Sequence, residues 1–294
     1  DQPALICEHI DWARSCGFEV TAAGKGTRYL PDYHSLTPDT VWAVLQQYLD
    51  IDDPESINLQ MFNSFLDGSK SAIEMTAVCN ATGLIPQDAG LQFPSASRFE
   101  LADICKPSSD GGVLTRSGTT EVVSSLTRAG ETVAHHLAMG TFVVIQAGSD
   151  YARQCLREYH MLPDKTGQYG ALYRPTHMIG LELGVSIASV ALRGEPTGQP
   201  MCFSSDVVAI AKRDLKIGEL LDGEGGHCVF GRQMPSEKSV SARTVPLGLS
   251  AGMRLVRNVA SGQMLCRDDV DVGTPDEATL ARDEMVSAFA PPKI

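Results

Sequence analysis

A helix pattern followed directly by a buried strand opens the chain, and this pair restricts the fold to the α/β class. Residues 2–16 place apolar side chains at near-helical spacing, and Gly17 is a typical residue at a helix end. Residues 18–23 form a short apolar run that predicts a buried strand. Such a pair normally belongs to a doubly wound sheet that has earlier strands, and the printed sequence starts without them.

The strand runs into Gly24-Lys25-Gly26-Thr27, which predicts a glycine-rich turn. Two interpretations of Lys25 are open: an anion contact, or a solvated lysine of the turn. The turn does not match GxGxxG, and no such motif follows a strand anywhere in the chain. The chain therefore carries no dinucleotide fingerprint of its own.

The segment of residues 61–83 concentrates acidic, basic and amide side chains more densely than other segments. Residues 59–66 predict a strand, Asp67-Gly68-Ser69-Lys70 a turn, and the following residues a helix that ends near Asn80. A strand–turn–helix unit with acidic, basic and amide side chains clustered on it is typical of a catalytic site.

Each charged residue of this segment has a structural alternative. Lys70 is either a surface lysine or an ammonium group directed at a substrate oxygen or phosphate. Asp67 is a helix cap, a partner of Lys70 or a metal ligand. Ser71-x-x-Glu74 matches a capping box, in which Glu74 only satisfies a backbone N–H.

A second group of polar residues has the same two interpretations. Asn63 and Asn80 are candidates for binding substrate hydroxyls, or they are turn and cap residues. Arg174 and His177 precede an apolar segment of residues 178–192, which predicts a buried helix that carries Glu182. Such groups are costly to bury without partners, so they predict a packed polar network, functional or structural.

The remaining elements follow from local signals. Predicted elements are a helix from Thr37 to about Tyr48, a long irregular segment over 84–120, a strand over 142–146 and a helix over 149–160. After residues 193–200 the pattern changes to short apolar runs separated by turns, which predicts a small β-rich domain from Asp206. The last 20 residues predict a helix or a frayed tail.

Composition excludes several classes of protein. The net charge of −12 and a pI near 5.0 argue against non-specific binding to nucleic acid or anionic membranes. The sequence has no run of 18 or more apolar residues, so no transmembrane helix is expected. The eight cysteines are scattered without a CxxC motif, which favours reduced thiols in a cytoplasmic protein and gives little support for zinc.

Five segments resemble a known family in the same order along the chain: DQPALICEHIDWARSCGFEV, AAGKGTRYLP, FLDGSKSAIEMTAVCNATGL, LYRPTHMIGLE, and AKRDLKIGELLDGEGG followed by PLGL. They resemble the SAF-domain-containing, homoserine-dehydrogenase-like oxidoreductases, of which the 1-deoxy-D-xylulose 5-phosphate reductoisomerase-like (DRL) enzymes are the best known branch. The resemblance implies an α/β (α+β) catalytic domain followed by a small β-rich, β-clip-like SAF domain. Expected parts are the end of an NAD(P)-binding Rossmann domain (1–30), a catalytic and dimerisation domain (31–200) and the SAF domain with a tail (201–294).

The resemblance also implies a reaction, in which a phosphorylated ketose rearranges and NADPH reduces the product, as in isoprenoid precursor synthesis. A lysine or a divalent ion (Mg²⁺ or Mn²⁺) would stabilise the charge, and the protein would be a homodimer. Expected catalytic residues are Lys70, Asp67, Glu74 and His177; expected substrate contacts are Lys25, Asn63, Asn80, Arg174 and Glu182; expected cofactor contacts are Gly24 and Gly26.

Two alternatives stay open. The first is a plain dehydrogenase of a hydroxy acid or sugar acid, similar to homoserine dehydrogenase. The second is a non-catalytic binding or dimerisation module, because the glycine-rich start of a Rossmann domain is absent from the printed sequence.

Overall fold

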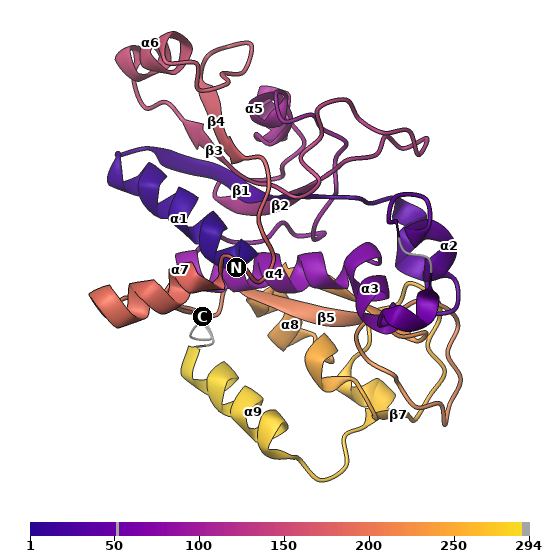
Figure 1. Ribbon diagram of the computed structural model, residues 1–294. Helices are drawn as coiled ribbons and strands as arrows, with labels where there is room; N and C mark the ends of the chain where they lie inside the picture. Colours follow the sequence, from indigo (N-terminus) through magenta and orange to yellow (C-terminus); the bar gives the residue numbers. More distant parts are fainter. Residues whose placement is uncertain (51–52, 290–294) are drawn as a thin grey trace. The chain divides into compact units, whose positions relative to one another are not determined.

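In the computed structural model, which describes residues 1–50 and 53–289, two units share the chain in alternating segments (Figure 1). The first unit holds Asp1–Leu30 and Glu74–Ser204, and the second holds Pro31–Ile73 and the described part of Ser205–Ile294. Helix α4 (Ser69–Thr82) belongs to both, because the division falls within it. The predicted α/β architecture with a small β-rich region is confirmed.

The first unit is built on a four-stranded sheet of order β2-β1-β3-β4. Strand β1 pairs in parallel with β2 and antiparallel with β3, which pairs antiparallel with β4. The strands are β1 (Glu19–Thr27), β2 (Thr119–Ser124), β3 (Thr141–Gln146) and β4 (Tyr169–Arg174). The strand predicted over 142–146 is confirmed. The predicted glycine-rich turn is wrong, because β1 continues through both glycines as an inner strand.

Helices cover both faces of this sheet. On one face, α1 lies along β1 and β3, and its Ile6 packs in one core with Met75 of α4 and Val143 of β3. On the other face, Leu101 of α5 packs with Phe142 of β3. The helices and helical turns of this unit are α1 (Gln2–Ser15), the later part of α4, α5 (Leu101–Ile104), η3 (Ser108–Asp110), α6 (Asp150–Glu158), α7 (Leu183–Ala188) and η4 (Ser189–Arg193).

The second unit combines short helices with two small antiparallel sheets, β5-β6 and β7-β8. Its core packs Ala209 and Val229 of the first sheet with Leu255 of the second and Leu265 of a nearby loop. Its elements are η1 (Pro31–Ser35), α2 (Val41–Leu45), η2 (Pro54–Ser56), α3 (Leu59–Leu66), β5 (Ser205–Ala211), β6 (Val229–Pro235), α8 (Ser236–Ser241), η5 (Leu247–Leu249), β7 (Arg254–Leu255), η6 (Arg267–Asp269), β8 (Val270–Asp271) and α9 (Glu277–Phe289).

Residues 59–66 form helix α3, so the predicted strand is wrong. The Asn58 side chain accepts a hydrogen bond from the Met61 backbone N–H at 3.0 Å and caps the helix. The predicted capping box is also wrong: α4 begins at Ser69, whose N–H donates to Asp67 Oδ1 at 2.9 Å. The helix predicted from Thr37 to Tyr48 is shorter, since α2 covers only Val41–Leu45.

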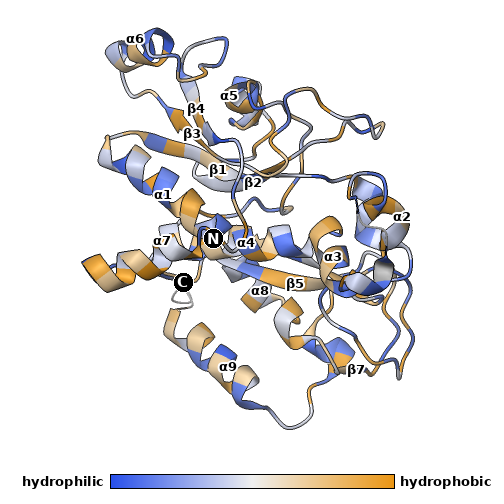
Figure 2. Ribbon diagram, viewed as in Figure 1, coloured by the Kyte–Doolittle hydropathy of each residue, from blue (hydrophilic) through white to orange (hydrophobic). Residues whose placement is uncertain are grey.

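Residues 178–192 do contain a helix, but the prediction that this helix is buried is wrong. Helix α7 continues into the wide turn η4, and its large apolar side chains face solvent within the unit. Leu181 is 79% exposed and Leu192 84% exposed. Figure 2 shows α7 as a largely apolar ribbon.

None of the helices in the described ranges is long and apolar enough to cross a membrane.

Candidate active site

Three strands of the first unit bring polar side chains into one row near the end of the sheet. In the register, Lys25 of β1 pairs with Thr141 of β3, which pairs with Arg174 of β4. Directly paired residues project from the same face of a sheet. That face is the one covered by α1 and α4, because Ala23, two residues before Lys25, packs there. We call Lys25, Thr141 and Arg174 the sheet-end row.

Lys25 forms a buried ion pair with Glu74 of α4. The two side chains are only 7% and 12% exposed, and Gln2 Oε1 of α1 lies 3.4 Å from Lys25 Nζ. Lys25 is therefore not a solvated turn lysine. A buried carboxylate beside an ammonium group can hold or pass a proton, and removing one partner leaves an uncompensated charge.

Arg174 and Glu182 form a second ion pair, in which Glu182 also accepts from the Met178 backbone N–H at 2.9 Å. Arg174 remains 40% exposed, so part of its guanidinium can meet an anion. His177 is buried, and its Nδ1 donates to the Met139 carbonyl oxygen at 2.8 Å. A carbonyl oxygen can only accept, so Nδ1 carries the proton of this bond.

His9 of α1 belongs to this cluster and was missed at the level of sequence. Its Nε2 lies 3.0 Å from Thr141 Oγ1. Burial lowers the pKa of His9, Glu8 opposes this effect, and the positive charge of Arg174 lowers the pKa further. The available signal was its position beside Ile6 and Ile10 on the apolar face of the first helix.

In the second unit, Asp67 is enclosed by structural partners. Its Oδ2 lies 2.8 Å from Lys212 Nζ, and the two side chains are 0% and 1% exposed. Lys212 Nζ also donates to the carbonyl oxygens of Leu36, at 2.7 Å, and Gly226, at 2.8 Å. These contacts favour a role for Asp67 in holding the fold, and nothing in the sequence pattern pointed to Lys212 as its partner.

Asn63 and Lys70 lie on either side of Asp67 in the sequence, and they differ in burial. Asn63 is fully buried, and its amide donates to the carbonyl oxygens of Leu36 at 2.9 Å and Gly225 at 2.8 Å. Lys70 is half-buried, with Nζ 4.2 Å from the centre of the Phe65 ring. A cation at this distance from an aromatic face is held by the ring electrons, and its side chain stays partly accessible.

Asn80, at the end of α4, holds the chain just before β5. Its Oδ1 accepts from the Ser204 backbone N–H at 2.9 Å, and its carbonyl oxygen accepts from the N–H groups of Met201 and Cys202. These bonds account for its polar side chain without a substrate.

Gly24 and Gly26 do not form a phosphate cradle. A Cβ atom on Gly24 would lie 1.7 Å from the Glu121 carbonyl oxygen, and one on Gly26 would lie 1.8 Å from the Leu137 carbonyl oxygen. Both glycines are required by close backbone packing on β1. Their predicted cofactor contact therefore has no support in this geometry.

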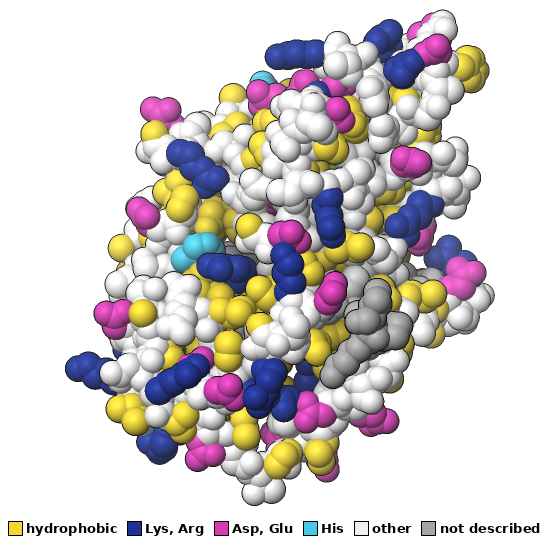
Figure 3. Space-filling view, turned by 180° about the vertical axis from the view of Figure 1, so that it is seen from behind, with side chains coloured by type: hydrophobic (Ala, Val, Ile, Leu, Met, Phe, Trp, Pro, Cys, Tyr) yellow, Lys and Arg dark blue, Asp and Glu magenta, His cyan; other side chains and the backbone are white. Residues whose placement is uncertain are grey.

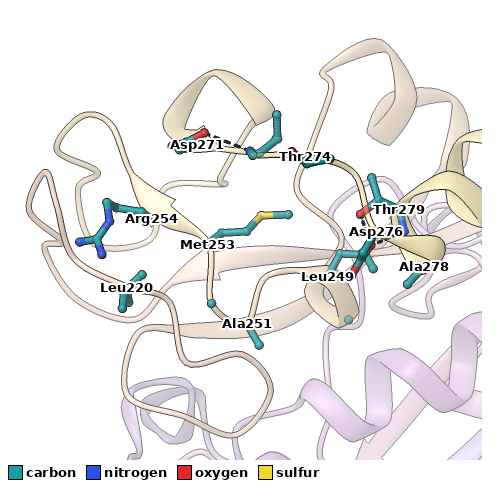
Figure 4. Close-up of a pocket in the computed structure, with 14 residues that line it drawn as sticks. Leu220, Leu249, Ala251, Met253, Arg254, Asp271, Thr274, Asp276, Ala278 and Thr279 are labelled. Carbon is teal, nitrogen blue, oxygen red and sulfur yellow. Dashed lines mark hydrogen bonds between the residues drawn. The ribbon is translucent and has the colours of Figure 1, made fainter.

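Among the described residues, no group of three or more His, Cys, Asp or Glu side chains is arranged to hold a metal ion. A cavity of about 530 Å³ opens in the second unit around Met253, Arg254, Asp271 and the start of α9 (Figure 4). None of the predicted site residues lines it, so we do not place the reaction there.

Two family models match the chain. Residues 206–271 match the SAF domain, and residues 1–183 match "Oxidoreductase DRL, catalytic domain". No curated protein matches. These matches define the class as an oxidoreductase with an appended SAF domain. A nicotinamide cofactor is the general expectation for an oxidoreductase domain of this kind. More particularly, the chain belongs to the DRL oxidoreductase family.

Proposed function

We propose that the protein is an NADPH-dependent, reductoisomerase-like oxidoreductase that acts on a small phosphorylated ketose. Its substrate would rearrange its carbon skeleton to an aldehyde, which accepts a hydride from NADPH. The proposal rests on the buried Lys25–Glu74 ion pair within the residues that match the DRL catalytic domain.

The rearrangement needs proton transfer between substrate oxygens and stabilisation of the charge that develops on them. Glu74, which forms an ion pair with Lys25 of the sheet-end row, would accept a proton from the substrate and return it. Arg174 is the candidate phosphate contact, because it is partly exposed and its fork of N–H donors matches phosphate oxygens. Glu182 positions this arginine through their ion pair. The catalytic roles of His177 and Lys70 stay predictions.

The distribution of charged side chains on the surface is compatible with a small anionic substrate. On the face shown in Figure 3, Lys and Arg side chains are scattered among Asp and Glu side chains and form no broad basic area. A few local cations can hold one phosphate group even at a net charge of −12.

The test is turnover of a phosphorylated ketose with NADPH by the full-length natural protein. Glu74→Gln should lower kcat/KM by about 100-fold or more, because it removes the proton acceptor. The double variant Lys25→Met, Glu74→Met removes both charges together, so it should fold and still be inactive. Glu158→Gln on the exposed surface of α6 is the control and should keep full activity.

Product analysis by ¹³C NMR separates the proposal from its alternative. A changed carbon skeleton supports a reductoisomerase, and an unchanged skeleton with a reduced carbonyl identifies a plain dehydrogenase. Full activity of the Glu74→Gln variant would remove the ion pair from the mechanism.

We also propose that the protein is a homodimer and that α7 and η4 form the contact between copies. We call residues 178–193, which comprise α7, η4 and the five residues before α7, the α7–η4 segment. Its large apolar side chains are half or more exposed: Met178, Ile179, Leu181, Leu183, Val185, Ile187, Val190 and Leu192. Contiguous apolar patches above a few hundred Å² usually mark interaction sites.

A further inference from the structure

A small cavity of the second unit is lined by three arginine side chains. It lies between α8, the loop that follows α8, and α9, and its volume is about 150 Å³. The three arginines are Arg243, Arg267 and Arg282. All residues that line the cavity belong to the second unit, and none of them was a predicted site residue. Because positive charges meet in this cavity, it is a candidate site for a small anion.

Arg282 of α9 is the fixed member of the three. Two nitrogens of its guanidinium pair with the two carboxylate oxygens of Asp206 on β5, and both side chains are largely buried. Ser239 of α8 donates a hydrogen bond to the same carboxylate. Breaking a buried pair leaves an uncompensated charge, so we expect the Arg282–Asp206 pair to stay formed when a ligand binds.

Arg243 and Arg267 are held less firmly. Arg243 Nη1 lies 3.1 Å from Asp268 Oδ1, and Arg267 Nη2 lies 2.6 Å from Asp283 Oδ1. The four side chains are about one third to two thirds exposed. Exposed ion pairs of this kind contribute little stability, so a more highly charged anion can replace either aspartate.

The backbone keeps these two arginines beside each other. The Arg267 N–H donates to the Arg243 carbonyl oxygen at 2.8 Å, and Thr244 pairs with Cys266 in an antiparallel bridge. Arg243 follows the C-cap of α8 and has a φ of +51°, a left-handed conformation that glycine adopts at lower cost. An arginine there is unfavourable for the backbone, and a ligand of the cavity gives a reason for its charge.

The size and lining of the cavity restrict the ligand. Pockets that bind drug-sized molecules measure about 300–1,000 Å³, so this cavity accepts a smaller molecule. The fork of N–H donors on a guanidinium matches phosphate oxygens in a bidentate contact. Val240, Pro246 and Val286 also line the cavity, and these apolar side chains suit a short carbon chain.

We infer that this cavity binds a small phosphomonoester. Its phosphate contacts Arg243, Arg267 and Arg282, and its carbon chain packs against Val240 and Val286. Arg282 keeps its pair with Asp206, while the phosphate replaces the aspartate partners of the other two arginines. The inference does not rest on the proposed function, because Arg174, the phosphate contact proposed for the substrate, belongs to the first unit.

The first experiment is isothermal titration calorimetry of the full-length natural protein with inorganic phosphate and with propyl phosphate. Arg243→Gln and Arg267→Gln should each weaken binding of propyl phosphate by about tenfold, because each removes a charge-assisted hydrogen bond. Propyl phosphate should bind several-fold more tightly than inorganic phosphate, because its chain covers the apolar wall. Binding of inorganic phosphate alone would refute a phosphomonoester as the ligand.

Two controls separate this cavity from other cationic positions. Arg213→Gln removes an exposed arginine that pairs with Glu219 in the same unit and does not line the cavity, so the affinity should stay within about twofold of wild type. Arg174→Gln removes the phosphate contact proposed for the substrate and should also leave this affinity unchanged. The proposed function and the present inference can therefore fail separately.

The second experiment tests the sign of the charge effect. Asp283→Asn removes the carboxylate that competes for Arg267 and should strengthen binding by about threefold or more, whereas Glu219→Gln should not change it. Arg243→Gly should weaken binding while the thermal unfolding midpoint stays the same or rises, which distinguishes lost binding from lost folding. A wild-type protein that binds neither anion would overturn the inference, and so would unchanged affinities in Arg243→Gln and Arg267→Gln.

Discussion

Glu121 is a buried carboxyl group that the sequence did not single out. It lies on β2 and accepts hydrogen bonds from Gln87 Nε2 at 2.6 Å and from the backbone N–H groups of Gln92, Phe93 and Val122. These bonds tie the irregular segment after α4 to the sheet. Burial raises the pKa of Glu121 to about 7, and this effect exceeds that of the hydrogen bonds, which lower it.

A raised carboxyl pKa makes the folded state bind a proton more tightly than the unfolded state. The contribution of Glu121 to stability should therefore be complete below about pH 4.5 and be lost as the pH rises through about 7. The loss should be on the order of 3 kcal/mol. Urea unfolding between pH 4.5 and 8 tests this: the stability difference between wild type and Glu121→Gln should change across this window, whereas exposed Glu131→Gln should show a constant difference.

At the residue scale, the sequence identified chemical groups but not their partners. Lys25 and Glu74 were both candidates, yet 49 positions separate them, and only the pairing of β1 with α4 brings them together. Lys212 was missed because its segment has the pattern of an ordinary strand and turn. Its importance depends on its ion pair with Asp67, which lies more than 140 residues earlier in the chain.

The α7–η4 segment gives a prediction at the level of the element. Leu181→Glu and Leu192→Glu each place a charge on the exposed apolar face and should convert the dimer to a monomer, because a stable interface buries about 800 Å² per partner and excludes unpaired charge. Analytical ultracentrifugation measures the mass. Leu280→Glu on α9, where the leucine is 57% exposed, is the matched control and should remain dimeric. Dimeric Leu181→Glu and Leu192→Glu variants would place the contact elsewhere, and a monomeric wild type would exclude the dimer.

Elements with strong local signals were predicted well. The first helix has a clear apolar face, and α6 has Ser149 as its cap, with Oγ accepting from the Ala152 N–H at 3.1 Å. The short apolar run of α3 was ambiguous between strand and helix, and the Asn58 cap decides in favour of the helix. Strand β1 passes through two glycines because its neighbours β2 and β3 leave no room for side chains there, which no local pattern reveals.

At the scale of the molecule, the second unit is assembled from two distant segments of chain. Residues 201–289 expressed alone would lack α3 and would leave Lys212 without Asp67, so this fragment should unfold at a lower temperature than one in which residues 31–73 are attached by a flexible linker. Losing one partner of a buried ion pair typically costs about 3–5 kcal/mol. Thermal unfolding followed by circular dichroism compares the two fragments, and equal midpoints would contradict the prediction.

The fold class and the change of pattern near residue 200 could be read from composition and periodicity. The membership of residues 31–73 in the second unit could not, because it depends on long-range contacts such as Asp67 with Lys212.

This split of the second unit has a consequence for biosynthesis. About 130 residues of the first unit separate residues 31–73 from the SAF segment, and their synthesis takes on the order of ten seconds at typical elongation rates. During that interval Gln60 and Asn63 cannot form their hydrogen bonds with the carbonyl oxygens of Glu224 and Gly225. The second unit is therefore still incomplete when all strands of the first unit's sheet have been synthesised. We expect chaperones to bind the nascent chain mainly at this stage.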